Sequence, residues 1–303
     1  MSMFSIVIPT YNQANLLNRC LQSITQQKFK NYEIIIIDNY SKDNTSKIVK
    51  KFNNKIKYIK FKNHGIIAKS RNLGIKKSKG KWICFLDSDD TWAPHKLQRL
   101  FTIQKNFLLD VICNAEWIFK GKNKKLWVYG PDDKNFYLKM ILKGNRFSTS
   151  GTAIKKSFLK KNNLFFSEKK SFITCEDYDF FLKIAQLRCK KKFINEPLGS
   201  HFFHSYSASS NFTKHRKAFI SVLKYHFSKN NFLKNKYSIR KILYRYDLKV
   251  QCSNLLSFKN FKNNFNKLLK TISKNPLISF ILILEFSFIK LRNIFFYIKF
   301  KGL

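Results

Sequence analysis

The chain has 303 residues and a mass of 36.1 kDa, which is room for one large α/β domain with an appendage or for two compact domains. It is 44% hydrophobic and 16% aromatic, with 32 phenylalanines, so it can bury a large core, and global disorder is excluded. The 59 Lys and Arg residues against 17 Asp and Glu give a formal net charge of +42. Such a charge favours polyanionic neighbours such as nucleic acid, an anionic membrane or phosphorylated substrates. AT-rich codon usage is the alternative explanation for the excess of lysine.

The first half of the chain alternates strand and helix patterns. Short apolar runs rich in β-branched residues predict strands, and apolar residues at helical spacing predict the helices between them. In chain order the expected elements are a strand at 4–9, a helix capped by Asn12, a strand at 33–38, a helix starting at 41–44, a strand at 56–61, a helix at 68–77 and a strand at 81–87. This alternation indicates βαβ units and a mostly parallel sheet, at whose carboxyl edge ligands bind. Asp38 and Asp87 both lie at that edge.

The second half of the chain is less regular. Strands are expected at Val111–Phe119 and Gly151–Ile154, and a helix from Glu176 to about Leu187. From residue 212 onward the chain holds 20 Lys and Arg residues against two acids. We therefore expect two parts, an α/β domain over residues 1–211 and a basic, mainly helical region over residues 212–303.

An apolar run at residues 276–289 stands out in the basic region, and cations follow it. The run is too short to span a bilayer, which takes about 20 residues, and Glu285 opposes spanning further. A helix lying in the plane of an anionic membrane fits the pattern, with residues 276–300 as the contacting segment. A helix that packs on the α/β domain is the alternative.

The six cysteines are scattered along the chain. They form no C-x-x-C pair and have no histidine at ligand spacing, so neither a zinc site nor a disulfide framework is expected. The first strand pattern begins directly after the N-terminal methionine, without a basic region or a cleavage site, which predicts no secretory signal. Both features favour a reducing, cytoplasmic compartment.

A D-x-D motif, Asp87-Ser88-Asp89, ends the strand predicted at 81–87. Side chains alternate along an extended chain, so Asp87 and Asp89 project to the same side. Two carboxylates at the carboxyl edge of a sheet suit a hard divalent cation such as Mg²⁺ or Mn²⁺. A simple turn is the alternative, since turns also favour Asp and Ser. The position after a buried strand, with Asp38 ending another, favours the cation site.

Further motifs occur in a fixed order along the chain. They are Val7-Ile-Pro-Thr-Tyr-Asn12, Glu33-Ile-Ile-Ile-Ile-Asp-Asn39, Ser41-Lys-Asp-Asn-Thr45, Ala68-Lys-Ser-Arg-Asn-Leu-Gly74, Gly80-Lys-Trp-Ile-Cys-Phe-Leu-Asp-Ser-Asp-Asp90 and Cys175-Glu-Asp-Tyr-Asp-Phe-Phe-Leu182. Together they resemble the family-2 glycosyltransferases of bacterial surface-polysaccharide synthesis, over residues 4 to about 210. The resemblance implies a GT-A fold, a Rossmann-like and mostly parallel sheet flanked by helices. It also implies an inverting transfer of a sugar from a nucleotide diphosphate to an acceptor hydroxyl.

The resemblance assigns a donor site. Pro9, Thr10 and Tyr11 would line the nucleotide pocket, and Asp38 would accept a hydrogen bond from the base, typically uracil. Arg71 would face the donor phosphates, which its guanidinium can bind through two parallel hydrogen bonds. The alternatives are a turn at residues 9–12, an Asp38 that caps a neighbouring element, and an Arg71 on a solvated helix face.

The resemblance also assigns a metal site for Mn²⁺ or Mg²⁺. Asp87 and Asp89 would hold the metal and the ribose-diphosphate, with Asp89 as the direct ligand. Such a metal neutralises the charge that grows on the departing diphosphate. His204 would complete the metal shell or pair with phosphate, ahead of His201, and a structural histidine is the alternative.

Asp177 matches the catalytic base of the family, which takes the proton from the attacking hydroxyl. Residues 174–177 also resemble a helix-capping box, and both roles are compatible because a carboxylate at a helix N-terminus stays ionised. Glu176 is expected to support the base and Asp179 to lie on a solvated helix face. Residues 148–151 are expected to border the acceptor site.

The predicted activity is therefore that of a glycosyltransferase, EC 2.4, acting from a UDP-sugar on a glycan or lipid-linked acceptor of lipopolysaccharide or capsule synthesis. Its basic region would place it peripherally on the cytoplasmic face of the inner membrane, since each cation near an anionic leaflet adds about 1 kcal/mol. One alternative is a nucleotidyltransferase on a similar fold, although residues 9–15 lack the glycine-rich loop of that chemistry. The other is a nucleic-acid-binding protein, but no binding motif is present, so no nucleic-acid partner is expected.

Overall fold

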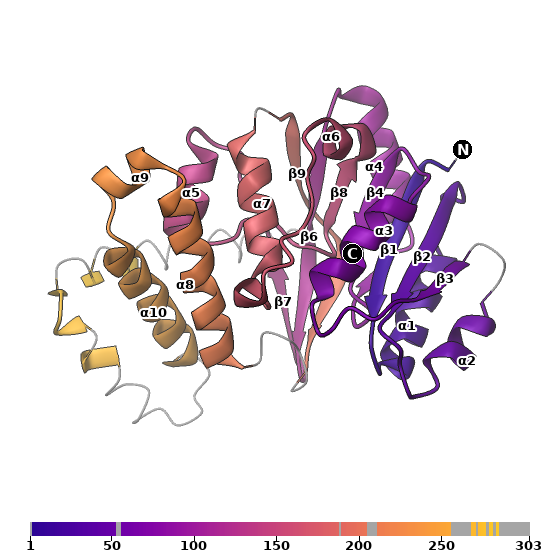
Figure 1. The fold of residues 1–303 in the computed structure, drawn as a ribbon, viewed down its shortest axis with the longest axis horizontal. Helices are drawn as coiled ribbons and strands as arrows, with labels where there is room; N and C mark the ends of the chain where they lie inside the picture. Colours follow the sequence, from indigo (N-terminus) through magenta and orange to yellow (C-terminus); the bar gives the residue numbers. More distant parts are fainter. Residues whose placement is uncertain are drawn as a thin grey trace.

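The computed structural model describes residues 2–52, 56–187, 189–204 and 211–255, with short pieces at 268–270, 272–276, 279–280 and 283–284. A nine-stranded sheet runs through the middle of the molecule, and helices cover both of its faces (Figure 1). The strand order is β3-β2-β1-β4-β8-β6-β9-β5, with β7 paired to β6. The expected α/β fold, a mostly parallel sheet flanked by helices, is confirmed.

The N-terminal half forms the parallel part of the sheet. Its strands are β1 (Phe4–Thr10), β2 (Tyr32–Asp38), β3 (Ile56–Lys60) and β4 (Trp82–Phe85). The helices between and after them are α1 (Ala14–Thr25), α2 (Thr45–Lys50), α3 (Ile67–Lys77) and α4 (Lys96–Asn106). Because β1 pairs with β2 in register from Phe4↔Tyr32 to Thr10↔Asp38, both strands end at one edge.

The rest of the sheet mixes strand directions. It comprises β5 (Thr91–Trp92), β6 (Val111–Lys120), β7 (Asn123–Trp127), β8 (Thr152–Lys155) and β9 (Lys191–Phe203). Strand β8 joins the two parts by pairing antiparallel with both β4 and β6, whereas β6 and β9 run parallel. Around them lie α5 (Phe136–Lys143), α6 (Lys156–Lys161), a short 3-10 turn (Lys170–Phe172) and α7 (Glu176–Gln186).

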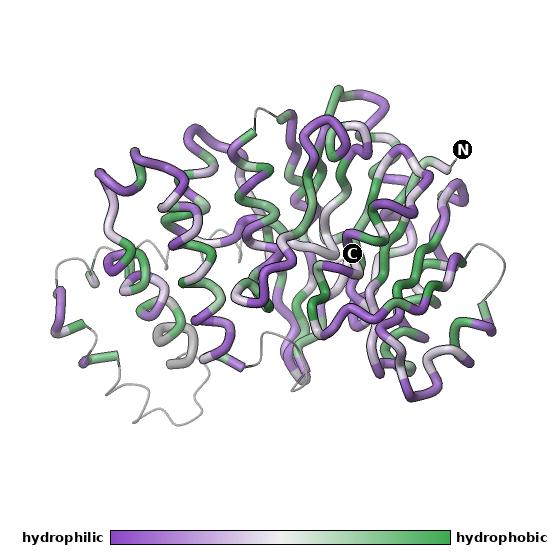
Figure 2. Tube along the Cα trace, in the orientation of Figure 1, coloured by the Kyte–Doolittle hydropathy of each residue, from purple (hydrophilic) through white to green (hydrophobic). Residues whose placement is uncertain are grey.

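The alternation of side chains along the strands divides the core into two layers. On β1, Ile6 and Ile8 pack with α1 on one face, whereas Val7 packs with Ile75 of α3 on the other. Figure 2 shows these strands as continuous hydrophobic segments between polar loops. Strands buried on both faces read as unbroken apolar runs, which is why the sequence pattern located them.

The C-terminal helices complete one of these layers. Helices α8 (Phe212–Ser228), α9 (Asn231–Lys236) and α10 (Ile239–Leu255) lie beside α5 and α7 (Figure 1). Phe219, Val222 and Leu223 of α8 are buried in the same hydrophobic cluster as Val7 of β1. The basic region therefore shares a core with the sheet as far as Tyr246 of α10.

Asp179 departs from its expected solvated position. It is fully buried, and its carboxylate contacts Lys183 Nζ at 2.6 Å and His226 Nε2 at 3.1 Å. His226 lies on α8 and also contacts the Tyr137 hydroxyl on α5 at 3.1 Å. The expectation was wrong because the partner that buries Asp179 comes from a helix that lies far along the chain.

Two predicted helix caps are also absent. Helix α1 starts after Gln13 rather than Asn12, and Asn12 has a φ of 50° and accepts a hydrogen bond from the Lys42 amide instead. Thr174 has a φ of 82°, so α7 begins after Cys175. The Glu176 carboxylate accepts from the Thr174 amide at 2.9 Å, which is the bond that the expected capping box assigned to Asp177.

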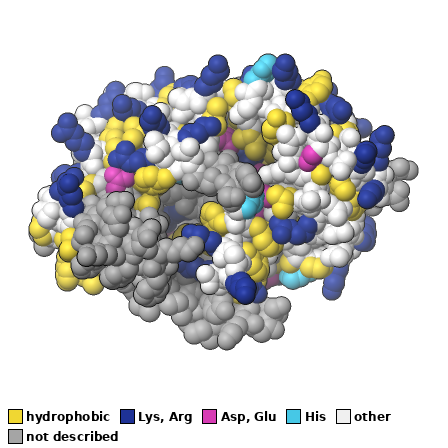
Figure 3. Space-filling model, turned by 90° about the horizontal axis from the view of Figure 1, so that it is seen from below, with side chains coloured by type: hydrophobic (Ala, Val, Ile, Leu, Met, Phe, Trp, Pro, Cys, Tyr) yellow, Lys and Arg dark blue, Asp and Glu magenta, His cyan; other side chains and the backbone are white. Residues whose placement is uncertain are grey.

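The Lys and Arg side chains are spread over the face visible in Figure 3 rather than gathered in one patch. None of the described helices is both long enough and apolar enough to cross a membrane. Most of the predicted membrane-contacting segment, 276–300, lies outside the described residues.

Candidate active site

A cavity of about 750 Å³ lies at the carboxyl edge of the parallel strands. It receives residues from the end of β1, from the loop after β4 and from the start of α7. The predicted site residues that line it are Pro9, Thr10, Tyr11, Arg71, Asp87, Asp89, Glu176 and Asp177. Ser148, Thr149 and Ser150 of the expected acceptor border line it too. At least five separate segments of the chain thus meet at one cavity, as open α/β sheets allow.

Arg71 joins two of these segments. Its guanidinium donates to Asp87 Oδ1 and to Glu176 Oε1, both at 2.7 Å, and the residue is only 4% exposed. Helix α3 buries it because Ala68, Arg71 and Ile75 lie on the face that packs against the sheet. The alternative of a solvated Arg71 is therefore wrong. The fork of the guanidinium fixes the loop after β4, at Asp87, relative to the N-terminus of α7.

Asp177 follows Glu176 at the N-terminus of α7. Burial and the charge of Glu176 raise the pKa of Asp177 to about 7, although the nearby guanidinium of Arg71 opposes the shift. Asn145 Nδ2 donates to Asp177 Oδ2 at 3.3 Å. A carboxylate with such a pKa can accept a proton near neutral pH, which is what a general base requires.

The loop after β4 is held from several sides. Arg19 donates to the Asp89 carbonyl at 2.6 Å, and its guanidinium lies 3.7 Å from the centroid of the Phe202 ring. The Ser150 hydroxyl accepts from the Asp87 amide at 3.1 Å and donates to Asp90 Oδ2 at 2.6 Å. These contacts order the aspartates before any ligand binds.

Two histidines contact this loop, His201 on β9 and His204 directly after the end of β9. His204 Nε2 lies 2.8 Å from Asp89 Oδ2, and His201 Nδ1 lies 2.9 Å from Asp90 Oδ1. Burial alone would lower the pKa of His201, but the hydrogen bond and charge of Asp90 raise it to about 9. Asp90 is itself buried, which raises the pKa of its carboxyl. His201 therefore pairs with Asp90, and His204 pairs with the predicted metal ligand.

Two predicted site residues, Asp38 and His204, are not among the residues that line the cavity. Asp38 is the last residue of β2. It is fully buried, and its carboxylate accepts from the amide and hydroxyl of Ser41 and from the Tyr58 hydroxyl. The neighbouring Asn39 lines the cavity instead. Asp38 thus orders the loop that follows β2.

Residues 5–174 match the family model described as glycosyl transferase family 2. The match spans more than half of the chain and includes every strand of the parallel part of the sheet. The chain belongs to glycosyltransferase family 2. This confirms the predicted family and the glycosyltransferase class, EC 2.4, and it disfavours the nucleotidyltransferase alternative.

Two relatives extend the match beyond that region. An uncharacterized glycosyltransferase of Haemophilus influenzae is 32% identical over 237 residues, which cover 75% of this chain and 78% of the relative. The poly(ribitol-phosphate) beta-N-acetylglucosaminyltransferase TarP of Staphylococcus aureus is 26% identical over 310 residues, covering 91% of this chain and 90% of TarP.

Solved structures share the fold of this glycosyltransferase. Residues 1–349 of S. aureus TarS, in complex with UDP-GlcNAc, superpose with a TM-score of 0.58 at 20% identity, over 79% of this chain and 77% of the TarS 1–349 chain. The mannosyltransferase PcManGT of Pyrobaculum calidifontis, in complex with GDP-Man and Mn²⁺, gives a TM-score of 0.51 at 13% identity, over 92% and 86% of the two chains. The GT-A-like arrangement is thereby established for this family member.

The residues expected to hold a metal in this glycosyltransferase form a pair rather than a complete shell. Among the described residues, no three His, Cys, Asp or Glu side chains are grouped to hold a cation. Asp89 and His204 nevertheless place a carboxylate oxygen and an imidazole nitrogen 2.8 Å apart. A carboxylate suits Mg²⁺ and Mn²⁺, and the diphosphate of a donor would supply further oxygens. The donor set therefore fits a divalent cation that binds together with the nucleotide.

Sequence reasoning missed Glu116. It lies on β6, is 1% exposed, lines the cavity and accepts from the Tyr129 hydroxyl at 2.9 Å. An acid inside the apolar run 111–119 was the available signal, because an acid is rarely buried without a partner. The side chains of Gln13, Asn63 and Lys214 also line the cavity, and no motif pointed to them.

Proposed function

We propose that this glycosyltransferase transfers a sugar from a UDP-sugar to an acceptor hydroxyl by a single inverting displacement, with Asp177 as the general base. One observation carries the proposal: Arg71 joins Asp87 of the D-x-D motif to Glu176 beside Asp177 at a single cavity. That arrangement brings a diphosphate site and a base of raised pKa to the same place. The TarS complex with UDP-GlcNAc makes UDP-GlcNAc the first donor to test.

The nucleotide is assigned to the side of the cavity formed by the end of β1. Pro9, Thr10 and Tyr11 line it there, and Tyr11 is 51% exposed, so its ring face is available for a base to stack on. Asn39 lines the same side and offers its amide nitrogen to the uracil or ribose. The Asn63 amide is already bonded to the Ser70 hydroxyl and the Gly65 amide, and it orders the loop beside Asn39.

The divalent cation, Mn²⁺ or Mg²⁺, is assigned to Asp89 and His204, with Asp87 beside them. A bound cation would neutralise charge on the departing diphosphate. The complex of PcManGT with Mn²⁺ supports metal use in a protein of this fold. Arg71 and the Asp90–His201 pair hold the loop in position, whether or not the cation is present.

In the displacement, the protein positions the two substrates and accepts one proton. The acceptor oxygen forms a bond to the anomeric carbon of the donor as the bond from that carbon to the diphosphate oxygen breaks. The proton of the acceptor hydroxyl passes to the Asp177 carboxylate, which Asn145 orients by its hydrogen bond. Attack on the face opposite the diphosphate inverts the anomeric configuration.

The acceptor is proposed to be a glycan or lipid-linked chain of a cell-surface polymer. The name of TarP, which aligns with nearly the whole length of this chain, states a polymeric acceptor.

We also propose that the basic C-terminal region holds the protein on the cytoplasmic face of an anionic membrane. Flotation with anionic liposomes at low salt is expected, with release at high salt, and a protein that stays unbound at low salt contradicts the membrane proposal.

Calorimetric titration of UDP, GDP and dTDP, each with and without Mn²⁺, tests the donor site. UDP is expected to bind in a metal-dependent way, and Asp89→Ala is expected to lose that dependence. Asp132→Ala removes an exposed acid that does not line the cavity and serves as the matched control. Asp177→Asn is expected to bind UDP-GlcNAc but not to turn it over. Absence of metal-dependent nucleotide binding in the unmodified protein contradicts the proposal.

A further inference from the structure

Glu116 is a buried acid on β6 that the proposed mechanism leaves unused. It is 1% exposed, it lines the cavity at the carboxyl edge of the sheet, and its Oε2 accepts from the Tyr129 hydroxyl at 2.9 Å. Its Oε1 is shielded from solvent, and no hydrogen-bond donor among the described residues reaches it. Because a buried acceptor without a donor is unfavourable, this oxygen is suited to a donor group on a bound molecule.

The neighbours of Glu116 leave this oxygen available. Lys96, a buried cation on α4, interacts with Glu116 electrostatically, but its ammonium donates to the Ser150 carbonyl at 2.8 Å. On β9 the residue paired with Glu116 is Gly199, which has no side chain to cover the carboxylate, and a Cβ there would lie only 3.4 Å from Oε1. Lys96 therefore balances the charge of Glu116 without using the hydrogen-bonding capacity of Oε1.

The register of the sheet places Glu116 beside the D-x-D motif. Strand β8 pairs antiparallel with both β4 and β6, so these two strands run in the same direction. Cys84 of β4 and Ile112 of β6 both pair with Ala153 of β8. Ser88, the middle residue of the motif, comes four residues after Cys84, and Glu116 comes four residues after Ile112. Glu116 therefore lies at the level of the motif, on a strand that β8 separates from β4.

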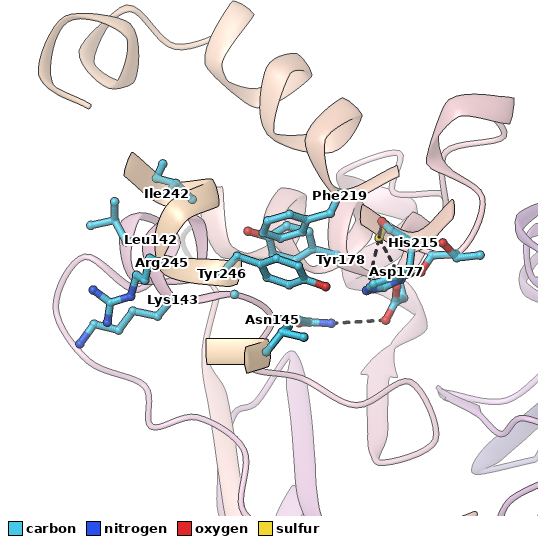
Figure 4. Close-up of a pocket in the computed structure, with 14 residues that line it drawn as sticks. Leu142, Lys143, Asn145, Asp177, Tyr178, His215, Phe219, Ile242, Arg245 and Tyr246 are labelled. Carbon is cyan, nitrogen blue, oxygen red and sulfur yellow. Dashed lines mark hydrogen bonds between the residues drawn. The ribbon is translucent and has the colours of Figure 1, made fainter. Parts of the chain in front are cut away.

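The order of the strands indicates which part of a donor would reach Glu116. The nucleotide is assigned to the end of β1 and the diphosphate to the D-x-D motif after β4, and β6 lies on the side of β4 away from β1. A nucleotide sugar is a linear molecule in which the diphosphate separates the nucleoside from the sugar. The part that extends past the motif is therefore the sugar. Its anomeric carbon must also lie near Asp177, which Figure 4 shows with its hydrogen bond to Asn145.

We infer that Glu116 selects the donor sugar by accepting a hydrogen bond from one sugar hydroxyl through Oε1, while the Tyr129 hydroxyl holds Oε2. The inference rests on the proposed function, because it needs a nucleotide sugar in this cavity. A site built to bond a particular hydroxyl rejects a sugar that lacks it, since the buried acceptor is then left without a partner. Glu116 is thereby a specificity-determining residue rather than a participant in the displacement.

Calorimetric titration of the full chain in the presence of Mn²⁺ tests the inference, with UDP, UDP-GlcNAc and UDP-glucose as probes. Glu116→Gln keeps the size of the side chain and removes its charge. It is expected to weaken the tighter-binding UDP-sugar about tenfold, because a charged acceptor forms a stronger hydrogen bond than a neutral one. UDP, which has no sugar at this position, is expected to bind unchanged. Deoxy analogues of the same UDP-sugar then identify the hydroxyl, since the analogue without it is expected to bind both proteins equally.

Glu196→Gln is the matched control. It makes the same substitution on β9, at an acid that bonds to Arg99 and does not line the cavity, and it is expected to leave every affinity unchanged. If Glu116→Gln does not fold, Tyr129→Phe repeats the test by removing the hydroxyl that holds Oε2, and it is expected to weaken the UDP-sugar alone.

The outcomes separate this inference from the proposed function. Equal weakening of UDP and the UDP-sugar would show that Glu116 acts through the structure alone, and unchanged binding of both would show that it has no role; either result overturns the inference. Binding of UDP but of neither UDP-sugar overturns it as well. Absence of metal-dependent UDP binding in the unmodified protein would instead contradict the proposed function.

Discussion

At Asp177, burial and the charge of Glu176 raise the pKa to about 7. A general base must be ionised, so kcat/KM is expected to rise about tenfold per pH unit below pH 7 and to level off above it. The rate of Asp177→Asn is expected to fall by roughly 10²–10⁴ and to lose this inflection. Initial rates with UDP-GlcNAc and an acceptor between pH 5 and 9 provide the measurement, and a flat profile through pH 7 contradicts the assignment.

Arg71 offers a second prediction for a single side chain. Arg71→Ala removes one partner of a buried ion pair and leaves Glu176, 8% exposed, without its counter-charge. The change is expected to lower the free energy of unfolding by about 3 kcal/mol. Arg99→Ala breaks a bridge to Glu196 that is largely solvated, and it is expected to cost at most about 1 kcal/mol. Urea denaturation of both variants measures the difference. Equal decreases in the free energy of unfolding would contradict the prediction that the buried Arg71 bridge contributes more stability than the solvated Arg99 bridge.

At the level of elements, a polar contact ties α8 to α5 and α7. His226 on α8 reaches both Asp179 and Tyr137, and it is 2% exposed. His226→Ala is expected to destabilise the protein by about 2 kcal/mol, because it leaves buried hydrogen-bonding groups unsatisfied. Lys224→Ala, at an exposed position on the same helix, is expected to have little effect. Thermal denaturation distinguishes the two, and a neutral His226→Ala would show that the contact contributes nothing.

The sequence located best those elements whose structure is determined by their own residues. The strands of the parallel sheet appear within about two residues of their predicted ends, because a strand that is buried on both faces has an unbroken apolar run in its own sequence. Asp179 was misplaced because its burial depends on α8, which follows it by more than thirty residues. The caps at Asn12 and Thr174 failed because both residues have positive φ values, which residue type alone did not reveal.

The candidate site also combines features that local sequence predicted with features that depend on distant contacts. Pro9, Thr10, Tyr11, Arg71, Asp87, Asp89 and Asp177 all line one cavity, as motif reasoning expected. The Arg71 bridge and the stacked rings of Tyr178, Phe219 and Tyr246 join residues from distant segments, so no local pattern contained them. Motifs therefore identified residues that line the cavity, whereas the contacts between distant segments required the fold.

At the scale of the whole molecule, the C-terminal helices belong to the core of the sheet domain. Phe219, Val222 and Leu223 fill a cluster that includes Val7 of β1. A chain cut after residue 211 is expected to expose that cluster and to lose cooperative thermal unfolding and near-UV circular dichroism. A truncated chain with a sharp melting transition would show that residues 1–211 fold alone.

The Arg71 bridge has a thermodynamic consequence for the order of events. Asp87 lies close enough to raise the pKa of Asp177, so a cation that neutralises Asp87 is expected to lower that pKa. By reciprocity, binding of a divalent cation beside Asp87 is expected to release protons near pH 7, and the affinity for the cation is expected to rise with pH. Calorimetry of Mn²⁺ binding in buffers of different ionisation enthalpy measures those protons, and zero release would contradict the coupling. The metal-free enzyme thus keeps its base partly protonated, and arrival of the cation converts it to the form that can accept a proton.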